Sequence, residues 1–535
     1  MRPDRLLPVR TPARRKAAIT RSLAVGLAGG LAAVTLAACG GDDGGEAGVA
    51  GEAPEEITLA VRNDVDTFDP ALSAYENGAS QIYEALYDTL VRIDLGTGDY
   101  VPAIASSWES TATTADFVIK KDLTCSDGSP LKPSDVAASI ERLADPDTGS
   151  VLTGRMFGAA GVKKVTADDE ASTLSIELNG PHIDMLDGLR SAFIVCPSGL
   201  EDTEKLATVP SGSGPYKLTK STRGDSYELE RWDSPAVEAD ATLPQRITMK
   251  VVTADSTRAN LFETDAADIV SVVGRDAARL AEEHEPVKGR GNGTESLMFN
   301  QRPGRPGAEL EVRQAVAQAL DAEGYVKAAS FGVADPINTM LSPSMQCYDE
   351  SNGEHAASFD VDAAKKTLAD AGYGPGGKTL AMTVVGMESQ NAGPEYIAEA
   401  LRTIGVDVEV KNGSLAQLVG IVYEEKEPWD VVVFPMISEA RSPFPMVTKT
   451  SSNLGEGGSY NFGRIKNEEY DRLVNRVSGE SDEARCATWS AAEQSLLERR
   501  DVVPLQWSTA DYFSKDLEFD AGYRVLNLRT IRTKG

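Results

Sequence analysis

The chain is poor in the side chains that usually carry covalent or metal chemistry. Its 535 residues include only three histidines, His182, His284 and His355, which are scattered and lack a partner at metal-ligand spacing. The sequence has no HExxH motif, no Walker phosphate loop and no G-x-S-x-G nucleophile elbow. Ser213 lies in S-G-S-G-P, where proline stands in place of the helix that follows such an elbow. The sequence therefore favours a protein that is not an enzyme and has no cofactor or metal.

An extracellular hydrolase is the alternative from the enzyme class, because dispersed residues can still form a Ser-His-Asp constellation. The glycine-rich run from Gly289 to Gly293 is not followed by a convincing helix, so it indicates a phosphate cradle only weakly. Release of product from a chromogenic peptide or ester would detect a hydrolase.

Cys39 has a context that predicts lipid attachment. The segment 1–38 carries seven cations and one acid ahead of an uncharged apolar stretch, Ser22 to Ala38, which is typical of a secretory signal peptide. The stretch is shorter than the roughly 20 residues of a membrane-spanning helix. Small residues before the cysteine resemble a bacterial lipobox, in which the thiol is acylated, for example with palmitate. Ordinary signal cleavage near Ala38 is the alternative. We expect a protein anchored to the extracytoplasmic face of the cell membrane.

Charge and length indicate which partners the protein can bind and how many domains it has. The whole chain has a formal charge of −29, and removal of the segment before Cys39 leaves about −35, the wrong sign for binding nucleic acid. Residues 39–56 are rich in glycine and acid, so we expect a flexible tether there. About 480 residues follow, which is more than one hydrophobic core usually organises, and two or three domains are expected.

Four cysteines follow the anchor, namely Cys125, Cys196, Cys347 and Cys486. No pair has the C-x-x-C spacing of a zinc or redox site, and an even count outside the cell suggests disulfides. Their number alone leaves three connectivities open.

Local patterns predict the first elements. Ile57 to Val61 reads as a strand, and Glu76 to Leu90 as a helix with an apolar residue every fourth position. The loop Tyr75-Glu76-Asn77 between them is either a helix cap or a ligand-facing loop. Further on, Phe117 to Ile119 indicates a strand, and Pro133 marks the first turn of a helix.

These elements also carry a family resemblance. Trp108, the run Cys125 to Leu131 and Asp135-Val136 resemble the signature of the extracellular solute-binding proteins of the oligopeptide, dipeptide and nickel transport class. Lys132 departs from it, because the family often has a Thr or Ser helix cap there. Further matching segments follow in family order: Gly212 to Tyr216, Leu297 to Asn300 with the helix 312–320, and the helix ending at Ala371-Gly372-Tyr373. The match covers about Ile57 to Leu505.

The resemblance implies an α/β fold, the two-lobed periplasmic-binding-protein-like fold of type II, cluster C, with an extra subdomain on the first lobe. Carried over, the first lobe comprises 57–95, 209–300 and 498–535, the subdomain 96–208, and the second lobe 301–497. The implied function is capture of peptides between the lobes and delivery to the permease subunits of an ABC importer, by a monomer. A nickel complex, haem or a sugar is the alternative ligand. Cys125 and Cys196 lie together in the expected subdomain, which predicts their pairing and leaves Cys347 for Cys486.

The segment 380–434 alternates strands and helices, which predicts a mainly parallel layer whose ligands lie beyond the carboxyl ends of the strands. The family places its ligand loop after the last of these strands, which here is the segment from Pro435 to Pro443. Candidate ligand-binding residues are Tyr75, Glu76, Asn77, Met436, Ile437, Ser438, Glu439 and Arg441.

Glu439 has the most specific expectation of this set. It falls where oligopeptide-binding members have an Asp that meets the ligand's terminal ammonium, although Met436 replaces the family's Trp three residues earlier. The alternative is an exposed Glu with Arg441 as a local partner.

Overall fold

The computed structural model describes residues 51–534 apart from short gaps at 74–76, 151, 159, 183–184, 238–240, 290–291, 388–391, 424–426, 439–441, 453–460, 478–479, 481, 508–509 and 523–524. The signal segment, Cys39 and the candidate residues Tyr75, Glu76, Glu439 and Arg441 therefore lie outside the described residues.

The end of the expected tether belongs to the folded part. The Glu52 carbonyl accepts the Thr533 N–H at 2.9 Å, and the Glu55 carbonyl accepts the Arg246 N–H at 3.0 Å. Strand β1 then begins at Glu56. The expectation of a tether up to residue 56 is therefore wrong for residues 52–56, because hydrogen bonds fix their backbone next to the C-terminal segment and to the start of β10.

The first sheet has seven strands in the order β12-β19-β11-β1-β10-β9-β8. Strand β1 (Glu56–Val61) is parallel to both of its neighbours, and the described pairs further out are antiparallel. The predicted strand at 57–61 is confirmed, since Ile57, Leu59 and Val61 are buried. The other members are β8 (Tyr216–Thr222), β9 (Ser226–Arg231), β10 (Arg246–Val251), β11 (Ile269–Val272), β12 (Val287–Gly289) and β19 (Ala510–Phe513).

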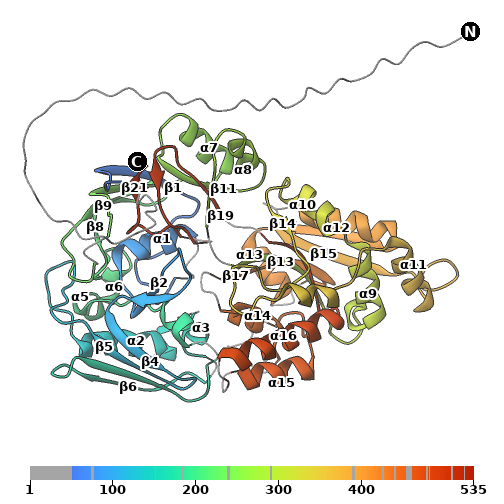
Figure 1. The fold of residues 1–535 in the computed structure, drawn as a ribbon, viewed down its shortest axis with the longest axis horizontal. Helices are drawn as coiled ribbons and strands as arrows, with labels where there is room; N and C mark the ends of the chain where they lie inside the picture. The colour runs from blue at the N-terminus through green and yellow to red at the C-terminus, as the bar shows by residue number, and fades with distance from the viewer. Residues whose placement is uncertain are drawn as a thin grey trace, which may run out of the picture. The chain divides into compact units, whose positions relative to one another are not determined.

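A smaller four-stranded sheet, β4-β5-β7-β6, lies within the expected subdomain together with helix α2 (Figure 1). Its strands are β4 (Ala105–Ser110), β5 (Thr114–Ile119), β6 (Val162–Asp168) and β7 (Thr173–Leu178). In β5, Ala115, Phe117 and Ile119 are buried and alternate with exposed residues. Helix α2 (Pro133–Ala144) begins at the predicted proline and buries Val136 and Ile140.

The departure at Lys132 is compensated by two carboxylates. The Lys132 N–H donates to Asp135 at 2.9 Å, and the Ser134 N–H donates to Asp169, from the β6–β7 turn, at 2.9 Å. Both acids satisfy donors at the start of α2 and place negative charge at the positive end of the helix dipole. A capping Thr or Ser is therefore not needed for α2 to start here.

Helix α1 (Asn77–Leu86) ends earlier than the predicted Leu90. The Leu86 carbonyl accepts the Gly214 N–H at 3.1 Å, so a backbone group from a distant segment occupies the acceptor that further helix would use. The helix length was predicted from spacing alone, and this long-range contact shortens it.

The second sheet has six strands in the order β14-β18-β13-β17-β15-β16. Strands β15 (Ala381–Met387), β16 (Asp407–Gly413) and β17 (Val431–Ser438) are parallel. Strands β13 (Asn292–Phe299), β14 (Asp335–Pro336) and β18 (Val502–Trp507) join them by antiparallel pairing. The predicted parallel layer is thus confirmed for three strands, and the whole sheet is mixed.

Helices cover both faces of the parallel part (Figure 1). Val384 of β15 packs in one core with Ile397 and Leu401 of α12 (Ala392–Thr403), while Val385 packs in another core with Leu418 of α13 (Leu415–Val422). Successive side chains of a strand point to opposite faces, so a continuous apolar run is what a strand buried on both sides requires.

The helices of this part agree with the sequence patterns. Helix α9 (Leu310–Ala319) buries Val312, Ala315, Val316 and Ala319. Helix α11 (Val361–Asp370) is followed by Gly372 at φ 86°, the predicted left-handed stop. The remaining helices named below are α8 (Gly274–Ala281), α10 (Ala322–Ala329), α14 (Phe444–Thr450), α15 (Glu468–Val477) and α16 (Asp482–Glu498).

The sheets divide the chain differently from the expected lobe boundaries. Strand β13 was expected in the first lobe, within 209–300, and β18 within 498–535, yet both pair in the second sheet. The chain changes sheet between β12 and β13 and again between β18 and β19. The lobe boundaries were carried over from the family resemblance and stay a prediction, since the strand pairing shows only which sheet each strand joins.

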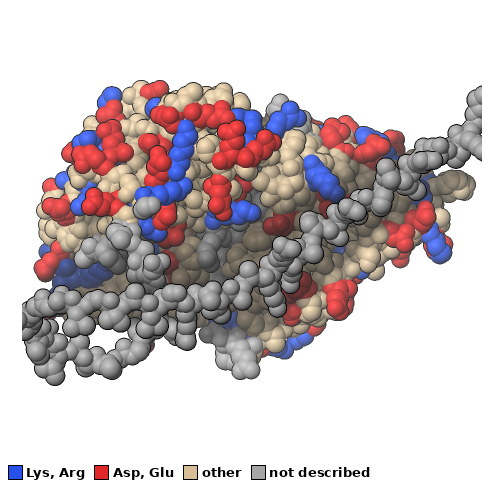
Figure 2. Space-filling view, turned by 45° about the horizontal axis from the view of Figure 1, so that its top comes forward, with Lys and Arg blue, Asp and Glu red and all other residues tan. Residues whose placement is uncertain are grey.

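Both predicted disulfides are present. Cys125 is bonded to Cys196 and Cys347 to Cys486, with sequence separations of 71 and 139. On the surface, acidic and basic side chains are interspersed over the face seen in Figure 2 rather than segregated by sign. The large negative charge is therefore spread over that face, as expected of charge that serves solubility.

Candidate functional site

The chain passes between the two sheets twice, once from β12 to β13 and once from β18 to β19. The described residues on either side of these two crossings are paired, because Gly289 lies opposite Ala510. Strands β13 and β18 pair antiparallel, with Thr294 opposite Trp507. The two parts of the fold therefore meet at a narrow pair of strands, which is the geometry of a hinge.

The segment predicted to contact ligand leaves the second sheet beside this hinge. Strand β17 pairs with β13 along its whole length, and Ser438 lies opposite Asn292, the first residue after a crossing. Residues 439–441 follow directly, before Ser442 and helix α14. The sequence prediction began the ligand loop at Pro435, whereas pairing with β13 extends β17 to Ser438, so the segment after the strand begins four residues later than predicted.

Strand β17 has a second feature of interest. Its pairing with β15 is confined to Val431 and Val432. Beyond Val432, β17 has β13 on one side and, among the strands that the structure describes, no partner on the other. A strand edge that has no neighbouring strand can pair with another extended chain through its backbone.

Three candidate residues, Met436, Ile437 and Ser438, lie within β17. Met436 is fully buried in a core cluster with Met298 and Met340, so its side chain is part of the interior in this structure. Ile437 and Ser438 are placed by their backbone pairing with Gly293 and Asn292. A ligand-binding role for these three stays a prediction.

The loop before α1 is fixed by a buried ion pair. Asp69, whose side chain is inaccessible to solvent, accepts both terminal N–H groups of Arg142, at 2.8 Å and 2.5 Å. Asp69 also accepts the Ala71 N–H at 3.0 Å. Since Arg142 lies on α2, the loop that leads toward Tyr75 and Glu76 is attached to the subdomain by a two-pronged contact.

Two tyrosines of α1 and its C-terminal end hold the same loop. The Tyr83 hydroxyl donates to the Thr67 carbonyl at 2.5 Å, and the Tyr87 hydroxyl donates to the Phe68 carbonyl at 2.7 Å. Burial raises the pKa of both tyrosines well above the usual value, so both stay protonated as donors. Asn77 is the first residue of α1, so the candidate loop joins two fixed segments.

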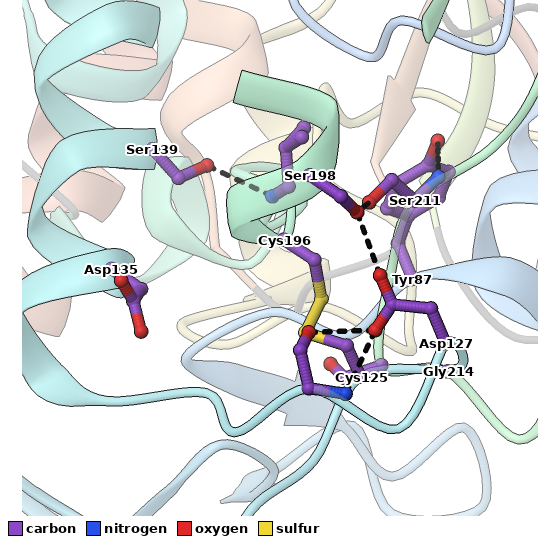
Figure 3. The surroundings of a disulfide bond; sticks show 12 residues. Tyr87, Cys125, Asp127, Asp135, Ser139, Cys196, Ser198, Ser211 and Gly214 are labelled. Atoms are coloured by element: carbon purple, nitrogen blue, oxygen red, sulfur yellow. Dashed lines mark hydrogen bonds between the residues drawn. A yellow bond between two sulfur atoms is a disulfide. The ribbon is translucent and has the colours of Figure 1, made fainter. Parts of the chain in front are cut away.

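The Gly212-Ser213-Gly214 segment packs against the C-terminal end of α1. A Cβ on Gly214 would lie 2.5 Å from the backbone of Leu86 and Tyr87, so only glycine permits this approach. The Cys125–Cys196 disulfide lies beside it, where Asp127 accepts the Ser198 hydroxyl at 2.8 Å and Ser198 shares a hydrogen bond with Ser211 (Figure 3). The motif read as a family signature thus acts by positioning α1.

A buried carboxyl group lies at the hinge and was not singled out from the sequence. One oxygen of Glu295, on β13, accepts the Tyr325 hydroxyl at 3.0 Å and the Gln506 side-chain amide at 2.9 Å. Burial raises the pKa of Glu295, although both hydrogen bonds act in the opposite direction. In the sequence Glu295 stands between Thr294 and Ser296, ahead of the apolar run from Leu297 to Phe299, so no local pattern marked it as buried.

The described residues meet neither the requirements of a metal site nor those of a membrane-spanning helix. No group of three or more His, Cys, Asp or Glu side chains in the described part of the chain could hold a metal ion. Every helix within that part is too short or too polar to cross a lipid bilayer.

Comparisons with known proteins bear on the whole arrangement. Residues 99–457 match the family model "Bacterial extracellular solute-binding proteins, family 5 Middle". The periplasmic murein peptide-binding protein MppA of Escherichia coli is 24% identical over 84% of this chain and 87% of its own length. Heme-binding protein A of Haemophilus influenzae is 23% identical over 86% of this chain and 90% of its own.

A solved structure agrees with the fold. The crystal structure of a substrate binding protein from Microbacterium hydrocarbonoxydans complexed with 4-hydroxybenzoate hydrazide superimposes with a TM-score of 0.73 and 26% identity. The match covers 90% of this chain and all of that one. The fold is therefore the two-lobed arrangement of periplasmic binding proteins of this type, with the first sheet in one lobe and the second sheet in the other.

Proposed function

The chain belongs to the bacterial extracellular solute-binding proteins of family 5, which serve ABC importers, and we propose that it captures peptides between its two lobes. It would then deliver them, as a monomer, to the permease subunits of an importer. The hinge between the lobes supplies the motion that such capture requires.

The observation that supports a peptide most directly is the short pairing of β17 with β15, which is confined to Val431 and Val432. Beyond Val432 this strand lacks a described partner on one side, and it leads into the segment 439–441 beside the hinge. An extended peptide can pair with such an edge through main-chain hydrogen bonds, which make no demand on its side chains. Backbone recognition of this kind suits a protein that accepts peptides of varied sequence.

We assign the peptide's terminal ammonium to Glu439. Closure of the lobes would remove this carboxylate from water together with the cation, and truncating one partner of such a pair costs about 2–5 kcal/mol. Tyr75, Glu76 and Asn77 would approach the ligand from the first lobe, on the loop that Asp69 and Arg142 hold. Ile437, Ser438 and Arg441 would complete the second wall.

Calorimetry with one defined ligand pair tests this assignment. We expect Glu439→Ala to weaken binding of the tripeptide Ala-Phe-Ala at least tenfold. Binding of its N-acetylated form should hardly change, because that ligand has no ammonium to lose. Equal losses for both ligands would remove Glu439 from the role, while failure of the parent protein to bind either would count against peptides as the ligand class.

Native mass spectrometry of freshly purified protein identifies a ligand without presupposing its class. A co-purified peptide is the expected result. A nickel complex, haem or sugar at stoichiometric amount would replace the peptide proposal by one of those ligands, each of which has a distinct mass.

We further propose that Cys39 carries the lipid that attaches the protein to the extracytoplasmic face of the membrane. Each methylene of an acyl chain that enters the bilayer contributes about 0.8 kcal/mol to anchoring. Cys39→Ser should therefore move the protein from the membrane fraction to the soluble fraction with its thermal unfolding unchanged. Retention of the variant in membranes would indicate a different anchor.

A further inference from the structure

The sheet order places two parts of the molecule on opposite flanks of the hinge. In the second lobe, β18 and β13 carry the crossings, with β17 next to β13 and β14 next to β18. The ligand segment leaves β17 on one flank. The residues that lead into β14 lie on the other.

The first lobe also reaches this second flank. Val272, the last residue of β11, pairs with Asp511 just after the crossing at 508–509, and Asp335 of β14 pairs with Trp507 just before it. The residues that follow Val272 and those that precede Asp335 are thereby brought together from different lobes.

A side-chain contact forms at that place, and we call it the hinge-flank contact. The guanidinium group of Arg275, on α8 of the first lobe, lies 5.3 Å from the ring centre of Phe331, which follows α10 in the second lobe. The ring also packs over Gly274, where a Cβ would meet it at 3.7 Å. Phe331 is 45% exposed and neighbouring Val273 is 43% exposed, so the contact lies at the surface.

Phe331 adopts a backbone conformation that its side chain disfavours. Its φ is 56°, in the left-handed region that bulky residues rarely occupy. Hydrogen bonds from the Ser330 hydroxyl and the Gly332 N–H to the Val326 carbonyl, at 2.8 Å and 3.2 Å, hold this turn after α10. Glycine or asparagine would satisfy the same turn with less strain, so the local structure gives no reason for an aromatic residue.

We propose that the hinge-flank contact opposes closure of the lobes and so sets the affinity of the ligand site. Rotation about the crossings that brings the lobes together on the β17 flank moves them apart on the β14 flank. The contact between Arg275 and Phe331 must then be broken before ligand is enclosed. A contact that favours one of two states lowers the apparent affinity of a ligand that needs the other. This inference rests on the proposed function, because it assumes that the lobes close around a ligand.

Two substitutions remove the contact without touching the ligand segment. Phe331→Asn keeps a residue that tolerates the left-handed conformation and deletes the ring, and Arg275→Gln deletes the charge. Each has a matched control. Phe359→Asn removes another half-exposed phenylalanine of the second lobe, and Arg279→Gln removes another arginine of α8, whose partners Glu263 and Asp276 lie in its own lobe.

Affinity for Ala-Phe-Ala is the first measurement. An exposed cation–π contact corresponds to roughly a two- to fivefold change in an equilibrium constant, so each variant should bind this peptide about two- to fivefold more tightly. The double variant should bind no more tightly than the single variants, because both remove the same contact. Both controls should bind as the parent does.

Small-angle X-ray scattering without ligand is the second measurement, and it does not depend on the ligand class. The radius of gyration of both variants should be smaller than that of the parent and the controls, since closed molecules become more frequent. Unchanged affinity together with an unchanged radius, or additive effects of the two substitutions, would overturn the proposal. If Ala-Phe-Ala binds to no form, the proposed function fails, whereas a smaller radius in the variants alone would still support the contact's role.

Discussion

The two walls of the candidate site are held in different ways. On the first lobe, the loop before α1 depends on a charge pair between Asp69 and Arg142, on two tyrosine hydroxyls and on glycines that admit a close backbone approach. On the second lobe, β17 depends on continuous pairing with β13. In an irregular loop, side chains must supply the hydrogen bonds that hold the backbone in place. In a sheet, the neighbouring strand supplies those hydrogen bonds.

The carboxyl groups beside the two walls follow the same contrast, although buried acids elsewhere in the second lobe, such as Asp501 beside Arg313, do have arginine partners. Asp69 has an arginine partner, whereas Glu295 and Glu493 accept hydrogen bonds from neutral donors. Burial raises the pKa of Glu295 and of Glu493 above the usual range for the residue. Removing a charge should therefore destabilise the loop before α1 on the first lobe. It should have little effect on the stability of β13 beside the hinge on the second lobe.

The largest effect should come from Arg142→Ala. It leaves the buried Asp69 carboxylate without a cation, and removing one partner of a buried pair typically costs about 3–5 kcal/mol. Chemical denaturation should show this loss of unfolding free energy. Asp69→Asn should cost less, about 1–3 kcal/mol, because the Arg142 side chain is 19% exposed and can reach water. The matched control is Arg472→Ala, in an exposed pair with Glu469, which should leave the unfolding free energy nearly unchanged.

Gly214→Ala should have the next largest effect. Its Cβ would lie within 2.5 Å of the Leu86–Tyr87 backbone, and relieving such overpacking costs about 1–3 kcal/mol. Because the strain falls on the end of α1, ligand affinity should decrease as well.

The control for that substitution is Gly372→Ala, which has φ 86° and open space around the new methyl group. It should cost about 1–2 kcal/mol through backbone conformation alone, with ligand affinity unchanged. Equal effects of the two alanines on affinity would contradict a positioning role for Gly214.

Glu295→Gln should have a small effect of opposite sign. Both donors, from Tyr325 and Gln506, reach the same carboxyl oxygen, which the glutamine carbonyl can replace without loss of either hydrogen bond. We expect unfolding free energy to change by less than about 1 kcal/mol at neutral pH, in the stabilising direction. A loss comparable to that of Asp69→Asn would show that the two carboxyl groups are held in the same way.

The same variant should reduce the dependence of stability on pH. A carboxyl group with a raised pKa in the folded state prefers to be protonated there, so folding gains stability as pH falls from neutral toward the usual range of glutamate, about 4.3. As the pH falls from 7.5 to 5, the thermal stability of the parent should therefore rise relative to that of Glu295→Gln. A constant difference between the two proteins over that range would mean that Glu295 is ionised throughout.

The sequence by itself determined the family and much of the local structure. It predicted the start of α2 at Pro133, the apolar face of α9, the left-handed stop at Gly372 and both disulfides, all of which the structure confirms. These features depend on neighbouring residues, or on motifs in a recognisable order, and both are legible along the chain.

Tertiary structure alone decided how distant segments combine. The sequence did not reveal that β13 and β18 join the second sheet, and it carried α1 past Leu86. It also gave no reason to expect Met436 in the core or Glu295 between Tyr325 and Gln506. Periodicity tells which side of a strand is apolar, but the partner of that strand depends on contacts with residues more than 200 positions away, as between Val270 and Phe513. For the same reason the contact between Arg275 and Phe331, which joins two lobes beside the hinge, had no counterpart in the sequence patterns.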